Sequence, residues 1–163
     1  MPLFQAFDVE PMVDGRQSAA ALRIRRGVAR LLREMGFGVV PELTLPSGHR
    51  ADIAAVGTAG EIWIVEIKSS LADYRADAKW PVYRRACDRL YFATTPDVGD
   101  IFPPAEGLIL TDGFAAEMLR EAPLARLAAP ARKAMTLRMA QAAARRLHEL
   151  EDPSARIVVP DLS

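Results

Sequence analysis

The spacing of apolar residues changes several times along the chain. From residue 24 to residue 35 they recur at spacings of four, three and four, at Ile24, Val28, Leu31 and Met35, and Leu32 lies beside Leu31. This period predicts one amphipathic helix. Asp14, three residues before Gln17, is the expected N-terminal cap, and Gly36 is the expected C-terminal stop.

Short apolar runs bounded by turn residues follow this helix. They predict strands over residues 39–45, 50–57, 61–68, 89–94 and 107–111. Ser70 is the expected cap of a helix that Pro81 interrupts, Asp112 is the expected cap of a helix over 113–120, and a long helix is expected from Pro130 to about 149. This order predicts an α/β fold in which helices flank both faces of a mixed β-sheet.

The turn after residue 57 decides which side chains meet across two of these strands. A two-residue turn at Thr58-Ala59 would pair Asp52 with Val65 and turn Glu66 to the other face. A three-residue turn that ends at Gly60 pairs Asp52 with Glu66, and glycine is the residue that its last position favours. Lys68 then shares a face with Glu66, because side chains alternate along a strand.

The composition indicates an ordinary globular domain. The 163 residues fit one domain over 1–163, with a core at about 16–111 and a C-terminal helical extension at about 112–150. Cys87 is the only cysteine, so no disulfide can form within the chain. No secretory signal or membrane-spanning segment is evident, and we expect a cytoplasmic protein with no membrane partner. The Ala/Arg-rich C-terminal helix is a candidate homodimer surface.

The charge pattern leaves nucleic-acid binding open. The formal net charge is zero, so no global field attracts the protein to DNA. The basic residues are nearly all arginines, and four of them share one face of the first helix: Arg23, Arg26, Arg30 and Arg33. Such a face is either simply solvated or a set of phosphate contacts.

Asp52, Glu66 and Lys68 are the candidate catalytic residues. Paired carboxylates on adjacent strands can hold Mg²⁺ or Mn²⁺, since magnesium prefers oxygen ligands and often takes only one or two protein carboxylates. A lysine beside them could orient a water molecule and stabilise negative charge on a phosphate. The alternative is an ordinary ion pair between Asp52 and Lys68, with Glu66 solvated.

The same residues carry a resemblance to a known superfamily. Glu42, the run Gly48-His49-Arg50-Ala51-Asp52 and the run Val65-Glu66-Ile67-Lys68, placed between two helices, resemble the PD-(D/E)XK nucleases. The resemblance implies a restriction-endonuclease-like αβββαβ core, metal ligation by Asp52 and Glu66, catalysis by Lys68 and a further ligand at the Ile67 carbonyl. Ala51 replaces the proline of the family name. Glu34 matches the helix glutamate of many members poorly, so Glu42 is the expected third acid.

A longer stretch resembles one narrower family. Glu66-Ile67-Lys68-Ser69-Ser70, Asp73, Asp77-Ala78-Lys79-Trp80, Tyr83 and residues 87–93 are similar to the MmcB-like DNA repair proteins. The resemblance implies a role in repair without deciding whether the protein cuts DNA. Two functions therefore stand: a Mg²⁺-dependent nuclease for damaged or branched DNA, or a catalytically silent DNA- or partner-binding module. Arg50, Arg23, Arg26, Arg30 and Lys79 are the candidate DNA contacts.

Overall fold

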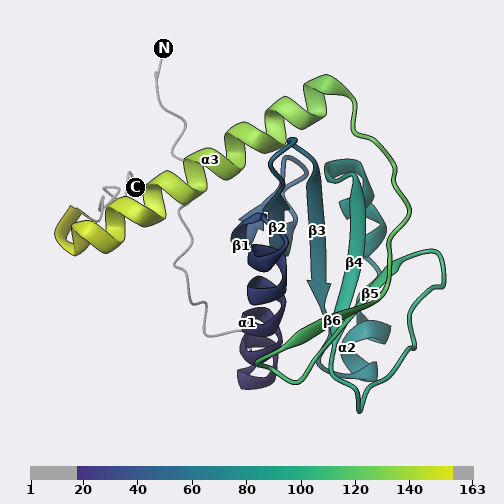
Figure 1. The fold of residues 1–163 in the computed structure, drawn as a ribbon. Coiled ribbons are helices and arrows are strands. Elements are labelled where there is room, and N and C mark those ends of the chain that lie inside the picture. The colour runs from purple at the N-terminus through teal and green to yellow at the C-terminus, as the bar shows by residue number, and fades with distance from the viewer. Residues whose placement is uncertain (1–17, 156–163) are drawn as a thin grey trace, which may run out of the picture.

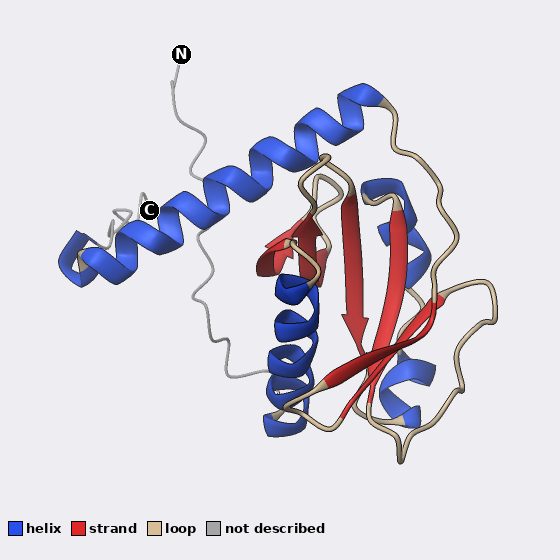
Figure 2. Cartoon of the chain, viewed as in Figure 1, coloured by secondary structure: helices blue, strands red, loops and turns tan. Residues whose placement is uncertain are grey.

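One six-stranded sheet organises the chain in the computed structural model, which describes residues 18–155 (Figure 1). The strand order is β1-β2-β3-β4-β5-β6, and Figure 2 shows the helices around it. The strands are β1 (Gly38–Thr44), β2 (Arg50–Val56), β3 (Ile62–Ile67), β4 (Arg89–Thr94), β5 (Gly107–Thr111) and β6 (Ala116–Arg120). The helices are α1 (Ala19–Glu34), α2 (Leu71–Ala76) and α3 (Ala129–Glu151), with 3₁₀ turns η1 (Trp80–Ala86) and η2 (Pro153–Ala155).

The strand directions confirm the predicted mixed sheet. β1, β2 and β3 form an antiparallel meander, while β3, β4 and β5 run parallel, which requires the crossover through α2 and η1. β6 returns antiparallel to β5. Pro41 lies in β1, an edge strand, where a missing N–H donor is tolerated.

Helix α1 covers one face of the sheet. Its buried residues Ile24, Val28 and Leu32 pack in one cluster with Ile53 and Val65 of the central strands. The Ser18 hydroxyl caps the helix by accepting the N–H of Ala21 at 3.1 Å. The predicted cap, Asp14, lies outside the described residues. The predicted stripe therefore forms the core, although Met35, the C-terminal cap, is 45% exposed.

The opposite face is covered by η1 and the first half of α3. Tyr83 of η1 and Met135 and Met139 of α3 pack against a cluster that includes Ile62 and Ile64 of β3. Leu147, further along α3, is 58% exposed. It lies on another side of the helix from the two methionines, whereas Arg146 faces β1 and donates to the carbonyls of Pro41 and Glu42.

The helix predicted over residues 113–120 is wrong, because this segment forms β6. Asp112 caps a turn, its Oδ1 accepting the N–H groups of Phe114 and Ala115 at 2.8 Å each. The chain then pairs with β5, and Ala116 and Met118 pack on the core while Glu117 is exposed. Alternating burial over five residues is a strand pattern, which a capping signal alone cannot distinguish from the start of a helix.

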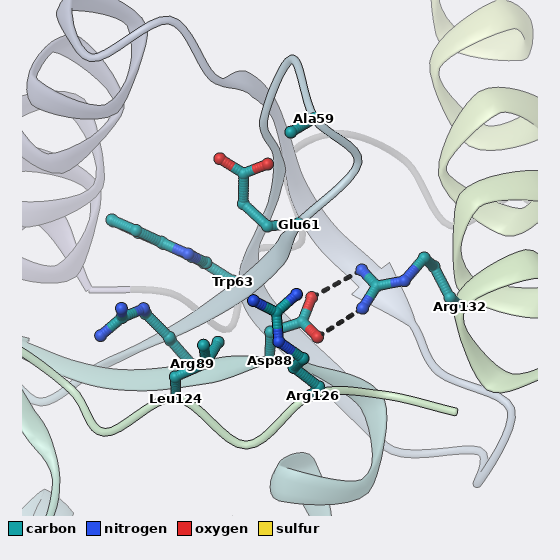
Figure 3. Close-up of a pocket in the computed structure, with 8 residues that line it drawn as sticks. All are labelled: Ala59, Glu61, Trp63, Asp88, Arg89, Leu124, Arg126 and Arg132. Carbon is teal, nitrogen blue, oxygen red and sulfur yellow. Dashed lines mark hydrogen bonds and ion pairs between the residues drawn. The ribbon is translucent and has the colours of Figure 1, made fainter. Parts of the chain in front are cut away.

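Asp88 ties α3 to the sheet. Its carboxylate accepts the N–H of Ile62 at 2.7 Å and that of Leu127 at 2.8 Å, and it forms a two-pronged ion pair with Arg132 at 2.6 and 2.7 Å (Figure 3). Burial opposes ionisation of Asp88, but the bonds from Arg132 and the two backbone groups hold its pKa below the usual range. One buried carboxylate thus joins β3, the segment before α3, and α3 itself.

Removing this carboxylate should destabilise the protein strongly. We expect Asp88→Ala to lower the free energy of unfolding by about 3 kcal/mol, because Arg132 and two backbone N–H groups lose their partner. Because the folded pKa is lowered, this contribution should be complete at neutral pH and lost as the pH falls below about 4. Urea unfolding measures both effects. The exposed Asp97→Asn is the control and should change stability by less than about 0.5 kcal/mol; an equally small effect of Asp88→Ala would contradict the assignment.

Candidate active site

The turn between β2 and β3 has the predicted length. Gly57 donates its N–H to the Glu61 carbonyl at 2.9 Å, and Gly60 donates to the Gly57 carbonyl at 3.0 Å. Gly60 has a φ of 86°, the left-handed conformation expected of it. The strands pair from Val56 with Ile62 to Ile53 with Val65, and this register places Asp52 opposite Glu66.

Each of the two carboxylates bonds to the backbone of the other's strand. Asp52 Oδ2 accepts the N–H of Ile67 at 2.7 Å, and Glu66 Oε1 accepts the N–H of Asp52 at 3.1 Å. These reciprocal bonds fix both side chains at the end of the hairpin that lies away from the turn. The second oxygens, Asp52 Oδ1 and Glu66 Oε2, accept no hydrogen bond within the part of the chain that the structure describes.

Burial and mutual repulsion dominate the electrostatics of this pair. Burial raises the pKa of Glu66 well above its usual range, and the Asp52 carboxylate raises it further. Burial also raises the pKa of Asp52, although the Ile67 N–H, Lys68 and Arg50 oppose that shift. Two buried acids that resist ionisation together form a site that a divalent cation would stabilise.

Lys68 lies just beyond β3 and is held by Asp77. Its Nζ donates to Asp77 Oδ2 at 2.6 Å, and Asp77 Oδ1 accepts the N–H of Lys79 at 2.8 Å. Burial works against ionisation of Asp77, but the bond from Lys68 brings its pKa below the ordinary value. Glu66 is only 3% exposed. The alternative of an Asp52–Lys68 ion pair beside a solvated Glu66 is therefore wrong.

Glu42 is buried near the Asp52–Glu66 pair, but its carboxylate lies beside an arginine of α1. It lies between Pro41 and Leu43, which pair with Ile53 and Ala51, so it is level with Asp52. Its φ of 48° interrupts the regular strand, and its carboxylate lies 3.7 Å from the Arg25 guanidinium. Within residues 18–155 no three His, Cys, Asp or Glu side chains are grouped to hold a metal ion. Glu42 and the Ile67 carbonyl therefore stay predicted ligands.

Two residues near the site were not predicted. Arg25 faces Glu42, and its spacing of three and seven from Val28 and Leu32 could have placed it on the inward side of α1. Tyr83 donates its hydroxyl to the Arg50 carbonyl at 3.1 Å, and its pKa is raised by burial and then by the nearby Glu66 and Asp52. Its 3₁₀ segment carries no periodic signal in the sequence.

The structure does not bring the first-helix arginines to the carboxylates. Arg23, Arg26, Arg30 and Arg33 are exposed on α1, which packs on the other face of the sheet. Arg30 donates to the Phe114 carbonyl at 3.1 Å and lies over its ring. Lys79 is exposed, whereas Trp80 packs against Phe92 in the interior. Arg50 alone of the predicted DNA contacts is close enough to influence Asp52.

A pocket of about 410 Å³ lies at the turn end of the same hairpin (Figure 3). It is lined by Ala59, Glu61, Trp63, Asp88, Arg89, Leu124, Arg126 and Arg132. The Asp88–Arg132 ion pair closes one side of it. Because Asp52 and Glu66 lie at the other end of the strands, the pocket is separate from the carboxylate site.

The order of the elements and the position of the site residues agree with the PD-(D/E)XK resemblance of the sequence. A helix, three antiparallel strands, a helical crossover and a parallel fourth strand carry an Asp, a Glu and a Lys on one face, as the PD-(D/E)XK resemblance implied. Residues 8–154 match the family described as DNA repair protein MmcB-like. The chain belongs to that family, which assigns it to DNA repair.

Two solved structures are similar to the chain. A protein of unknown function from Silicibacter pomeroyi is 40% identical with a TM-score of 0.84, over 88% of this chain and 99% of that one. A repair endonuclease from Pyrococcus abyssi is 17% identical with a TM-score of 0.32, over 62% of this chain and 42% of that one. No curated protein matches. None of the helices within residues 18–155 has the length and apolar character that crossing a membrane requires.

The carboxylate pair should give the metal-free protein an unusual dependence on pH. Because the folded pKa of Glu66 is raised, the folded state retains a proton that the unfolded state releases. With EDTA present, stability should therefore fall as the pH rises above about 4.5, by up to about 1.4 kcal/mol per pH unit. Urea unfolding of Glu66→Gln should show a flatter profile. Identical slopes for the two proteins would contradict the buried, mutually repelling pair.

Proposed function

We propose that the protein is a metal-dependent nuclease of DNA repair, which hydrolyses phosphodiester bonds in damaged or branched DNA. The observation that carries the proposal is Asp52 facing Glu66 across β2 and β3, with Lys68 on the same face. Membership of the MmcB-like family supports the repair context. The metal would be Mg²⁺, with Mn²⁺ as a substitute.

The donor set fits a hard divalent cation. Each carboxylate uses one oxygen for a backbone N–H and keeps the other for a ligand. Magnesium is commonly held by one or two carboxylates together with several waters, so two acids suffice. A bound ion polarises a phosphate oxygen and lowers the pKa of a ligated water. Asp52 and Glu66 would hold it, with Glu42 and the Ile67 carbonyl as further proposed ligands.

Lys68 would act on the charge that develops during hydrolysis. Its ammonium group is buried and anchored by Asp77 at 2.6 Å, so its position is set before DNA arrives. A fixed cation in a dry site stabilises negative charge on the phosphate without further reorganisation. It would also orient the attacking water. Arg50, beside Asp52, would hold a neighbouring phosphate.

Two observations favour a second candidate function. Lys68 is already paired with Asp77, and no third acid joins the pair among the described residues. A module that kept the fold and lost catalysis would show both features. Such a module would bind DNA or a protein partner without metal, and its DNA affinity would fall steeply with salt.

Metal binding should appear as stabilisation of the fold. At a metal concentration one hundred times the dissociation constant, Mg²⁺ or Mn²⁺ should raise the free energy of unfolding by about 2.7 kcal/mol. Asp52→Asn and Glu66→Gln should abolish this increase, because each removes one charged ligand. Asp97→Asn should keep it. An increase that survives in both site variants would place the ion elsewhere.

Cleavage assays separate the two candidate functions. We expect Mg²⁺- or Mn²⁺-dependent cutting of single-stranded, flapped or junction DNA, and a loss of about 100-fold or more in Lys68→Ala. Asp97→Asn should cut as the wild type does. Equal cutting by Lys68→Ala would remove Lys68 from the mechanism. DNA binding in EDTA, together with no cutting of any of these substrates when Mg²⁺ or Mn²⁺ is present, would support the silent module instead.

A further inference from the structure

Helix α3 carries a second apolar stripe that nothing in the described structure covers. Met135 and Met139 bury one side of the helix against the sheet. The opposite side carries Leu137, Ala140, Ala144 and Leu147, at spacings of three, four and three, which align them along one line of a helix. Leu137 is 54% and Leu147 is 58% exposed.

A charged residue continues this stripe at each end. Lys133 precedes Leu137 by four positions, and Glu151 follows Leu147 by four. Both are exposed, and neither has an ion-pair partner among residues 18–155. The full spacing of four, three, four, three and four is that of the contact positions of a coiled coil.

The stripe is symmetric about position 142. Leu137 and Leu147 lie five residues from it on either side, and Ala140 and Ala144 lie two residues from it. Lys133 and Glu151 lie nine residues from it, with opposite charges. In an antiparallel pair with a second copy of the same helix, leucine would therefore contact leucine, alanine would contact alanine, and lysine would contact glutamate. A parallel copy would bring lysine to lysine and glutamate to glutamate.

We propose that this face of α3 binds a second copy of the chain in an antiparallel, two-fold symmetric helix pair. Lys133 of one protomer then forms an ion pair with the partner's Glu151, and the reverse, as a two-fold interface requires. Ala140 and Ala144 at the centre allow close approach of the two helix backbones. The leucines close the stripe on either side of them.

The rest of the fold leaves room for this arrangement. The stripe faces away from the side of α3 that Met135 and Met139 bury, so the two sheets lie on the outer sides of the helix pair. Figure 1 shows the C-terminal end of α3 reaching past β1. One helix pair buries less than the roughly 1,200–2,000 Å² of a stable interface, so dissociation should be measurable on dilution.

Sedimentation of the full chain over a range of concentrations tests the proposal. The wild type should pass from monomer to dimer, and Leu147→Glu should remain monomeric, because it buries charge at the interface. Leu119→Glu is the matched control, an exposed leucine on β6 that is 53% exposed, and should dimerise as the wild type does. A monomeric wild type at every concentration would overturn the proposal, as would equal dimerisation of Leu147→Glu.

Charge reversal tests the identity and direction of the occupant. Lys133→Glu and Glu151→Lys should each raise the dimer dissociation constant by about tenfold, since each converts two attractive pairs into repulsive ones. The variant with both reversals should recover wild-type affinity. A parallel helix pair predicts that the single reversals leave the dissociation constant unchanged, and a different partner protein predicts no recovery in the double variant. Either result would overturn the antiparallel dimer.

Cross-linking provides an independent readout of direction. Ala140→Cys mixed with Ala144→Cys should form a disulfide-linked dimer on oxidation, because position 140 meets the partner's position 144. Each variant alone should form far less. Efficient cross-linking of Ala140→Cys with itself would show a parallel pair and overturn the proposal. The native Cys87 is buried, and burial raises the pKa of its thiol to about 12, so it should not interfere.

Discussion

The register of the β2–β3 hairpin is the constraint on which the site depends. Gly60, with a φ of 86°, ends a three-residue turn and thereby sets Asp52 opposite Glu66. A slip of one residue would turn Glu66 to the other face and would also move every core residue of β3, which is buried along its whole length. The packing of the sheet and the alignment of the carboxylates therefore require the same turn.

Burying the two carboxylates side by side lowers the stability of the fold. Asp52 and Glu66 are buried side by side, and burial raises the pKa of both. Their reciprocal bonds to the Ile67 and Asp52 N–H groups hold them in place despite the repulsion. Asp88 shows the contrast, because a structural carboxylate in this protein is matched by a guanidinium and two backbone N–H groups. This unmatched buried pair is the observation from which we propose a cation site.

The hairpin turn, the position of Lys68 on the face of Glu66 and the αβββαβ order of elements could be predicted from the sequence, because they depend on residues close together in the chain. The glycine turn and the alternation along each strand act over a few residues, so a pattern can reveal them. The surroundings of Glu42 could not be predicted, since its φ of 48° and its contact with Arg25 depend on how α1 meets an edge strand. The ion pair between Lys68 and Asp77 could not be predicted either, because the two residues lie nine positions apart in different elements.

The proposed metal site places a divalent cation between Asp52 and Glu66. A crystal soaked in Mn²⁺ tests it most directly, because the ion's anomalous scattering locates it without reference to activity. The predicted result is one strong peak within coordination distance of Asp52 and Glu66, lost in crystals of Asp52→Asn. No peak between these carboxylates in a soaked crystal that diffracts well, or a peak that persists in Asp52→Asn, would contradict the metal site.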